Sequence, residues 1–110
     1  MIATAMNTAQ LIVYVTEGPI DEVAVATVKE TVPGAVVLAD VLEPLYDASI
    51  STREAAHTLG RIKTELESMV ETGSRIAVIC RRHGEDLGTR SHFLRSLCAS
   101  ADRVHFLNRT

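Results

Sequence analysis

Leu11-Ile-Val-Tyr-Val15 is a continuous apolar run made almost entirely of β-branched and aromatic residues. Such a run, without polar residues at alternate positions, is typical of a strand that is buried on both faces of a parallel sheet. The pattern recurs in Ala35-Val-Val-Leu-Ala39, in Ile76-Ala-Val-Ile-Cys80 and in the shorter Val104-His-Phe-Leu107. The sequence therefore predicts a sheet of about four mainly parallel strands.

Segments with helical periodicity lie between these strands. Apolar residues recur at helical spacing from Ile20 until Pro33-Gly34 ends the pattern. Ser51-Thr-Arg-Glu54 matches a capping box and predicts the start of a long helix. A third helix is expected after the polar segment 81–89. Strands that alternate with helices through right-handed crossovers predict an α/β, three-layer Rossmann-like domain with helices on both faces of the sheet.

The two longer helices each have one apolar face. In the long helix this face is a stripe at spacings of three and four residues, formed by Ala55, Leu59, Ile62, Leu66 and Met69. In the last helix the face consists of Phe93, Leu94, Leu97, Cys98 and Ala101. We expect the long stripe to pack on the sheet, and a helix–helix contact in a homodimer is the alternative.

The length of 110 residues and an apolar fraction of 46% fit one domain, with residues 1–10 as a flexible leader and 11–110 as the folded unit. The longest apolar runs fall far short of the roughly 20 residues that a membrane helix needs. The first ten residues also lack the basic and apolar regions of a secretory signal. A cytoplasmic protein is therefore expected, with Cys80 and Cys98 as buried thiols rather than zinc ligands or a disulfide.

Charge is distributed unevenly along the chain. Residues 1–74 contain 4 basic and 11 acidic side chains, whereas residues 75–110 contain 7 arginines and 3 acids. Arginine binds phosphate or carboxylate in a bidentate manner, which lysine does not. This choice favours an anionic partner such as the phosphate of a nucleotide or nucleic acid. The alternative is a solvated face or a salt-bridge network in a dimer interface.

The carboxyl ends of the first and third strands are the predicted site, because open parallel sheets bind ligands there. The first strand runs into Thr16-Glu-Gly-Pro-Ile-Asp21, and the third into Arg81-Arg-His-Gly-Glu-Asp-Leu-Gly-Thr-Arg-Ser91. Glycines, hydroxyls and a helix start attract phosphate. We therefore assign phosphate binding to Thr16, Gly18, Arg81, Arg82, Gly88, Thr89, Arg90 and Ser91. The alternative is an ordinary surface loop with Thr89 as the helix N-cap, and His83 is a candidate general base.

The first strand together with the residues that follow it, Leu11 to Asp21, resembles the opening of Toprim domains, the metal-binding modules of topoisomerases and primases. In that family a hydrophobic strand ends in Glu-Gly, and a later Asp-x-Asp precedes a glycine and a helix; here the matching segment is His83-Gly-Glu-Asp-Leu-Gly88. The resemblance implies that Glu17 acts as general acid or base. It also implies that carboxylates hold Mg²⁺ during phosphodiester cleavage or transfer, as in a nuclease, and these would be Glu17, Asp21, Glu85 and Asp86. His83 replaces the first Asp of the motif, which would weaken magnesium binding.

A second resemblance uses other residues. Leu87-Gly-Thr-Arg90 looks like the Gly-Thr-Arg/Lys loop of CARF domains, which bind cyclic oligoadenylates and of which some stand-alone forms cleave the ligand without metal. This likeness implies phosphate contacts from Thr89, Arg90 and Ser91, with Thr16 and Gly18 from the first strand, in a dimeric sensor. Three hypotheses thus stay open: a Toprim-like phosphodiester enzyme, a CARF-like nucleotide sensor or ring nuclease, and a non-enzymatic homodimeric interaction domain.

Overall fold

The structure, a computed structural model, describes residues 10–47, 49–82 and 88–107, with only the backbone of residues 88–91. Four strands, three α-helices and one short 3-10 helix follow each other along the chain. They are β1 (Gln10–Thr16), α1 (Glu22–Thr31), β2 (Val36–Ala39), η2 (Glu43–Tyr46), α2 (Thr52–Glu71), β3 (Arg75–Arg81), α3 (Gly88–Ala99) and β4 (Arg103–Leu107).

The strands form one sheet in the order β2-β3-β1-β4, and every neighbouring pair is parallel. The connection through α1 passes β3 to reach β2, and the connection through α3 passes β1 to reach β4. The apolar runs of β1 and β3 occupy the two central positions, as expected for strands buried on both faces. The predicted α/β, Rossmann-like fold with a parallel four-stranded sheet is confirmed.

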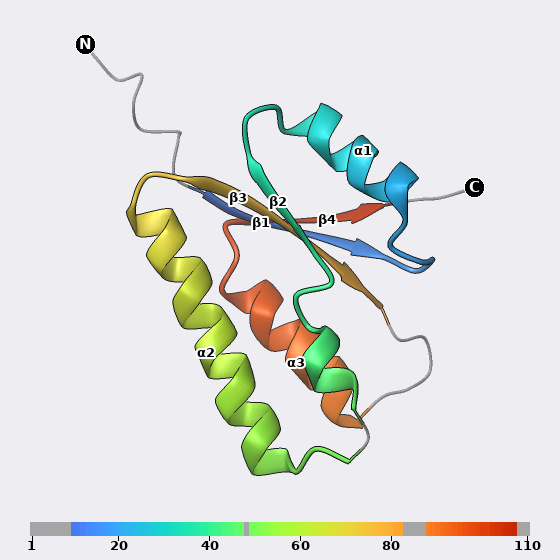
Figure 1. The fold of residues 1–110 in the computed structure, drawn as a ribbon, viewed down its shortest axis with the longest axis vertical. Helices are drawn as coiled ribbons and strands as arrows, with labels where there is room; N and C mark the ends of the chain where they lie inside the picture. The colour runs from blue at the N-terminus through green and yellow to red at the C-terminus, as the bar shows by residue number, and fades with distance from the viewer. Residues whose placement is uncertain (1–9, 48, 83–87, 108–110) are drawn as a thin grey trace.

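The helices cover both faces of this sheet, with α1 on one side and α2, η2 and α3 on the other (Figure 1). Side chains of β1 alternate between the two layers. Ile12 and Tyr14 lie in the core beneath α1 together with Val28. Leu11, Val13 and Val15 lie in the larger core on the opposite face, to which α2 and α3 contribute.

The long apolar stripe of α2 packs into this larger core. Ala55, Leu59 and Leu66 are buried there, and Ile62 and Met69 pack against them. Ser51 is the N-cap of α2, because its Oγ accepts a hydrogen bond of 3.1 Å from the backbone amide of Glu54. The capping box and the packing of the stripe on the sheet are therefore confirmed. The stripe thus packs on the sheet of its own chain, as expected, with Ile62 and Met69 partly buried.

Several element boundaries differ from the prediction. Thr16 belongs to β1, and a 3-10 helix, η2, forms where a loop was expected from residue 43. Pro44 lies in the first turn of η2, where its fixed φ and missing N–H are tolerated. Helix α3 begins at Gly88, so residue 89 lies inside the helix rather than at its N-cap.

The last strand, β4, lies at one edge of the sheet and is anchored to the start of β1. The amide of Asp102 donates to the carbonyl oxygen of Leu11, and the carboxylate of Asp102 accepts from the amide of Leu11, both at 2.8 Å. On the face of α1, the ring of His105 stacks on that of Tyr14 with centroids 5.2 Å apart. Within the ranges that the structure describes, none of the helices has the length and apolar character required to cross a bilayer.

Candidate functional site

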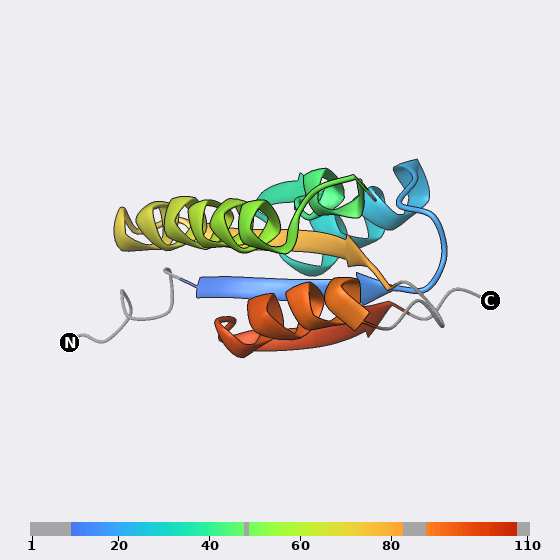
Figure 2. The same ribbon diagram turned by 90° about the horizontal axis from the view of Figure 1, so that it is seen from below.

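The carboxyl ends of β1 and β3 lie side by side at the centre of the sheet (Figure 2). Thr16 pairs with Arg81 in the parallel register, and the amide of Arg82 donates a 2.8 Å hydrogen bond to the carbonyl oxygen of Thr16. The two segments singled out in the sequence, after Val15 and after Cys80, are therefore direct neighbours at one end of the sheet.

The chain leaves these two strands on opposite faces. After β1 it continues to α1, and after β3 it continues to α3, which covers the other face (Figure 1). Neighbouring parallel strands whose connections diverge in this way leave a crevice between their carboxyl ends. Doubly wound folds bind ligands in such a crevice. The candidate site of this chain is therefore the crevice between residues 16–18 and residues 81–82.

Local hydrogen bonds hold the tip of β1 in place. Thr16 is fully buried, although it is polar, and its Oγ1 accepts a hydrogen bond of 3.2 Å from the amide of Gly18. This bond gives the buried hydroxyl oxygen a donor, without which its burial would be costly, and it accompanies the turn of the chain out of the strand. The Gly18 amide therefore has a protein partner rather than pointing freely into the crevice.

Glu17 and Arg82 face each other across the two strand tips. One oxygen of the Glu17 carboxylate lies 3.9 Å from a guanidinium nitrogen of Arg82, and the two side chains are 81% and 55% exposed. An ion pair that is this long and this well solvated contributes at most about 1 kcal/mol. Either side chain can therefore leave this ion pair and bind a ligand at little cost in free energy.

Asp21, the second acid of the β1 segment, has a structural role. It is the N-cap of α1, and its Oδ1 accepts a hydrogen bond of 3.0 Å from the amide of Ala24. A capping carboxylate at this position satisfies an amide that the helix cannot pair internally and also complements the helix dipole. The predicted ligand role of Asp21 would have to coexist with this cap.

The rest of the predicted site is only partly described. His83, Glu85 and Asp86 lie outside the described residues. Gly88, Thr89, Arg90 and Ser91 form the first turn of α3, whose amides lack partners within the helix because of their position. In the described part of the chain no group of three or more His, Cys, Asp or Glu side chains is arranged to hold a metal ion. Of the four predicted metal ligands the structure describes two, Glu17 and Asp21, which are both exposed, and two carboxylates alone are not a magnesium site.

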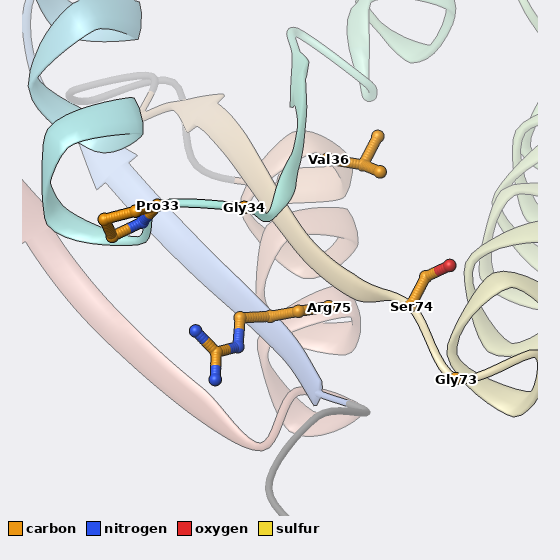
Figure 3. A pocket seen from close by; sticks show the side chains of 6 residues that line it. All are labelled: Pro33, Gly34, Val36, Gly73, Ser74 and Arg75. Atoms are coloured by element: carbon orange, nitrogen blue, oxygen red, sulfur yellow. The ribbon is translucent and has the colours of Figure 1, made fainter.

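Two shallow hollows are lined by residues other than those of the two strand tips. One, of about 340 Å³, is lined by the turns before β2 and β3, including Gly34, Gly73 and Arg75, at the amino ends of these strands (Figure 3). Gly34 and Gly73 have φ angles of +87° and +93°, which the tight turns require and which glycine adopts without strain. The other, of about 490 Å³, is lined by residues of a single segment, from Ile20 to Lys29. Neither hollow joins β1 to β3.

Asp40, which sequence reasoning missed, adds a third group at the carboxyl end of the sheet. It follows β2 directly, has a φ angle of 58°, and donates its amide to the carbonyl oxygen of Ile79 at 2.8 Å. Burial raises the pKa of the neighbouring Cys80 thiol to about 12, with smaller contributions from Cys98 and from the carboxylate of Asp40. The signal was present in the sequence, because Asp40 is the first polar residue after the second apolar run.

Comparison of the chain with protein-family models and with curated proteins finds no match. The resemblances to Toprim and CARF domains therefore stay predictions from short motifs.

Proposed function

We propose that this domain binds a phosphate-bearing ligand of the nucleotide class in the crevice between the carboxyl ends of β1 and β3. The observation that supports this most is the adjacency of Thr16 and Arg81 at a point where the chain leaves the two strands on opposite faces. The function thus rests on the topology and on the residues that the topology brings together.

Arg82 is the side chain that we expect to contact the phosphate. Its side chain is more than half exposed, and a nitrogen of its guanidinium lies 3.9 Å from the nearest carboxylate oxygen of Glu17. A phosphate accepts two parallel hydrogen bonds from a guanidinium, which is a stronger interaction than this long pair. The first turn of α3 follows β3 after the segment 83–87, and its amides and dipole favour an anion as well.

The proposal is tested by isothermal titration calorimetry with ATP, GTP and inorganic tripolyphosphate in the presence of EDTA. We expect wild-type protein to bind all three, and Arg82→Ala to weaken each by about tenfold, as expected for loss of a charge-assisted hydrogen bond. Arg103→Ala is the matched control, because Arg103 is exposed at the amino end of β4, at the opposite end of the sheet. Absence of binding to wild-type protein would contradict the proposal, as would equal loss in both variants.

Metal-dependent phosphodiester cleavage of Toprim type is the second candidate function, favoured by the exposed carboxylate of Glu17 at the tip of β1. If it holds, Mg²⁺ or Mn²⁺ raises the melting temperature because the ion binds the native state alone. Glu17→Gln abolishes this shift, and nuclease activity on labelled oligonucleotides is lost with it. A metal-independent melting temperature up to millimolar ion would remove this candidate.

A CARF-like sensor is the alternative within the nucleotide class. In that case a cyclic oligoadenylate stabilises the protein without metal, and Arg90→Ala abolishes the stabilisation while leaving the melting temperature of the free protein unchanged. A linear oligoadenylate of the same length is the control for the ring.

A second copy of this chain is the partner that we propose for β4. Val104 and Phe106 are 37% and 64% exposed on this edge strand. Antiparallel pairing of two β4 strands about His105 would set Val104 of one copy opposite Phe106 of the other, and such aromatic–β-branched pairs stabilise antiparallel sheets. Sedimentation velocity should show a dimer that Phe106→Lys dissociates, whereas Val23→Lys, at a residue 62% exposed on α1, leaves it intact. A monomeric wild-type protein at tens of micromolar would contradict this proposal.

A further inference from the structure

Strand β4 has exposed side chains on both faces of the sheet, over residues 103–106. Because side chains alternate along a strand, Arg103 and His105 lie on the face that carries α1, where the ring of His105 stacks on that of Tyr14. Neither residue belongs to the crevice between the tips of β1 and β3, so their arrangement needs an explanation of its own.

The stack between Tyr14 and His105 leaves one ring face open at the edge of the sheet. The ring centroids are 5.2 Å apart with an angle of 26° between the planes, which is close to the spacing of about 4.8 Å between neighbouring strands. The two rings therefore lie side by side, as β1 and β4 do. One face of the imidazole contacts Tyr14, and the other faces away from β1, beyond the edge strand.

The buried ring holds the exposed ring in place. Tyr14 is 3% exposed and lies in the core beneath α1, whereas His105 is exposed. A ring whose orientation is fixed in this way can stack a further flat group with little additional loss of side-chain entropy. Nucleobases are flat groups that stack on aromatic side chains, including histidine.

Two arginines on the same face favour an anionic partner. Arg103 is exposed and lies two residues before His105, about 7 Å along the strand. Arg75 is half-buried and lies on this face as well, because it is two residues before Ala77 of the core beneath α1. Figure 3 shows its side chain extending across β1 toward β4. The carboxylate of Asp102, next to Arg103 in sequence, is bonded to an amide at the start of β1.

We propose that this face of β4 binds single-stranded nucleic acid, with a base stacked on the open side of His105 and backbone phosphates held by Arg103 and Arg75. Single strands offer unstacked bases joined by phosphates, and proteins bind them with aromatic rings beside cationic side chains. A duplex keeps its bases in its own stack and fits this face less well.

The site on β4 is separate from the crevice and does not depend on the function proposed for the crevice. A mononucleotide, with a single base, should bind β4 too weakly to affect titrations at the crevice. A second copy paired through β4 about His105 would place its own side chain on the open side of the imidazole. Nucleic acid and a second copy therefore exclude each other at this edge.

The test is fluorescence anisotropy of a labelled 12-nucleotide single-stranded DNA of mixed sequence, titrated with the full chain in EDTA at low salt. We expect wild-type protein to bind, His105→Ala to weaken binding about tenfold, and His105→Phe, which keeps a flat ring, to retain it. Arg103→Ala should weaken binding and also reduce its dependence on salt, because one phosphate contact is lost. His57→Ala and Arg61→Ala are the matched controls, because both residues are exposed on α2, which covers the other face (Figure 1).

Four results would each overturn the proposal. The first is that wild-type protein does not bind the oligonucleotide at low salt. The second is that an abasic oligonucleotide of the same length, or the duplex, binds as tightly as the single strand, because charge alone would then be recognised. The third is that His105→Phe loses binding although its melting temperature equals that of the wild type. The fourth is that sedimentation velocity shows a dimer that binds the oligonucleotide without dissociating.

Discussion

The amide of Arg82 is bonded to the carbonyl oxygen of Thr16, one residue beyond the last pair of the β1–β3 ladder. The spacing of the two strand tips is thus set by backbone hydrogen bonds and does not depend on the side chains that line the crevice. Substitutions at Glu17 and Arg82 should therefore change ligand binding with little effect on the fold, whereas substitutions that disturb the backbone at Thr16 should affect both.

Replacement of Thr16 by valine tests whether the Thr16 hydroxyl holds the tip of β1 in place. The change keeps the shape of the buried side chain but leaves the amide of Gly18 without its acceptor, which should cost about 1–2 kcal/mol in the free energy of unfolding. Thr27→Val is the control, because the Thr27 hydroxyl is exposed and bonds within helix α1. Urea denaturation followed by circular dichroism measures both, and an equal effect of the two substitutions would contradict a supporting role of Thr16.

Glu17→Gln distinguishes the two candidate chemistries by the direction of its effect. If the crevice binds phosphate without metal, removing the carboxylate relieves repulsion and releases Arg82, so tripolyphosphate should bind several-fold more tightly. If the crevice binds phosphate through a metal ion, the same substitution removes a ligand and binding in Mg²⁺ should weaken. Titrations with tripolyphosphate in the presence of EDTA and in the presence of Mg²⁺ distinguish the two cases. The free energy of unfolding should change by less than about 1 kcal/mol in either case, because the ion pair is exposed.

Two substitutions of Asp21 distinguish its role as a helix cap from a role as a metal ligand. Asparagine is as good an N-cap as aspartate, whereas alanine is not, so Asp21→Asn should leave stability nearly unchanged and Asp21→Ala should cost about 1 kcal/mol. A role in metal binding would appear as loss of the Mg²⁺-induced melting shift in Asp21→Asn at unchanged stability. Equal destabilisation by asparagine and alanine would contradict the cap.

The fold was predictable because hydrophobic periodicity dominates this chain. The apolar runs of β1 and β3 lack polar interruptions, and they occupy the two central strands. The capping box at Ser51 marked the start of α2 correctly, since a side-chain cap is local in sequence. The end of β1 was less accurate, because the pairing of the polar residue Thr16 with Arg81 is a tertiary contact that no local pattern contains.

The site was predictable only in its location. The rule that parallel sheets bind ligands at their carboxyl ends pointed to the tips of β1 and β3 before any geometry was known. It did not show that Asp21 caps α1 through a local bond from the backbone amide of Ala24, and it could not show that Glu17 pairs with Arg82, because that contact depends on the distance between side chains at the ends of two strands. Asp40 is visible in the sequence as the first polar residue after the second apolar run, but its positive φ angle and its buried oxygen, which has no donor among the described residues, are properties of the folded chain alone.

Because the pKa of the buried Cys80 thiol is raised, we expect the protein to lose stability at high pH. Its folded-state pKa of about 12 lies well above the value of 9.0 for an exposed thiol, because the group is fully buried. Between these values the native state retains a proton that the unfolded state has lost, so the free energy of unfolding falls as pH rises from about 9 toward 12. Each pH unit costs at most about 1.4 kcal/mol for one group.

The measurement is the urea midpoint at several pH values between 8 and about 10.5, in wild-type protein and in Cys80→Ala. Wild-type protein should lose stability over this interval with a steeper slope than Cys80→Ala, even if the alanine variant is less stable at every pH. Cys98→Ala is the control, since the Cys98 thiol is only partly buried, although burial raises its pKa too. The same slope in wild-type protein and in Cys80→Ala would show that the thiol ionises in the folded state as easily as in the unfolded chain, and that the core beneath α3 admits water to it.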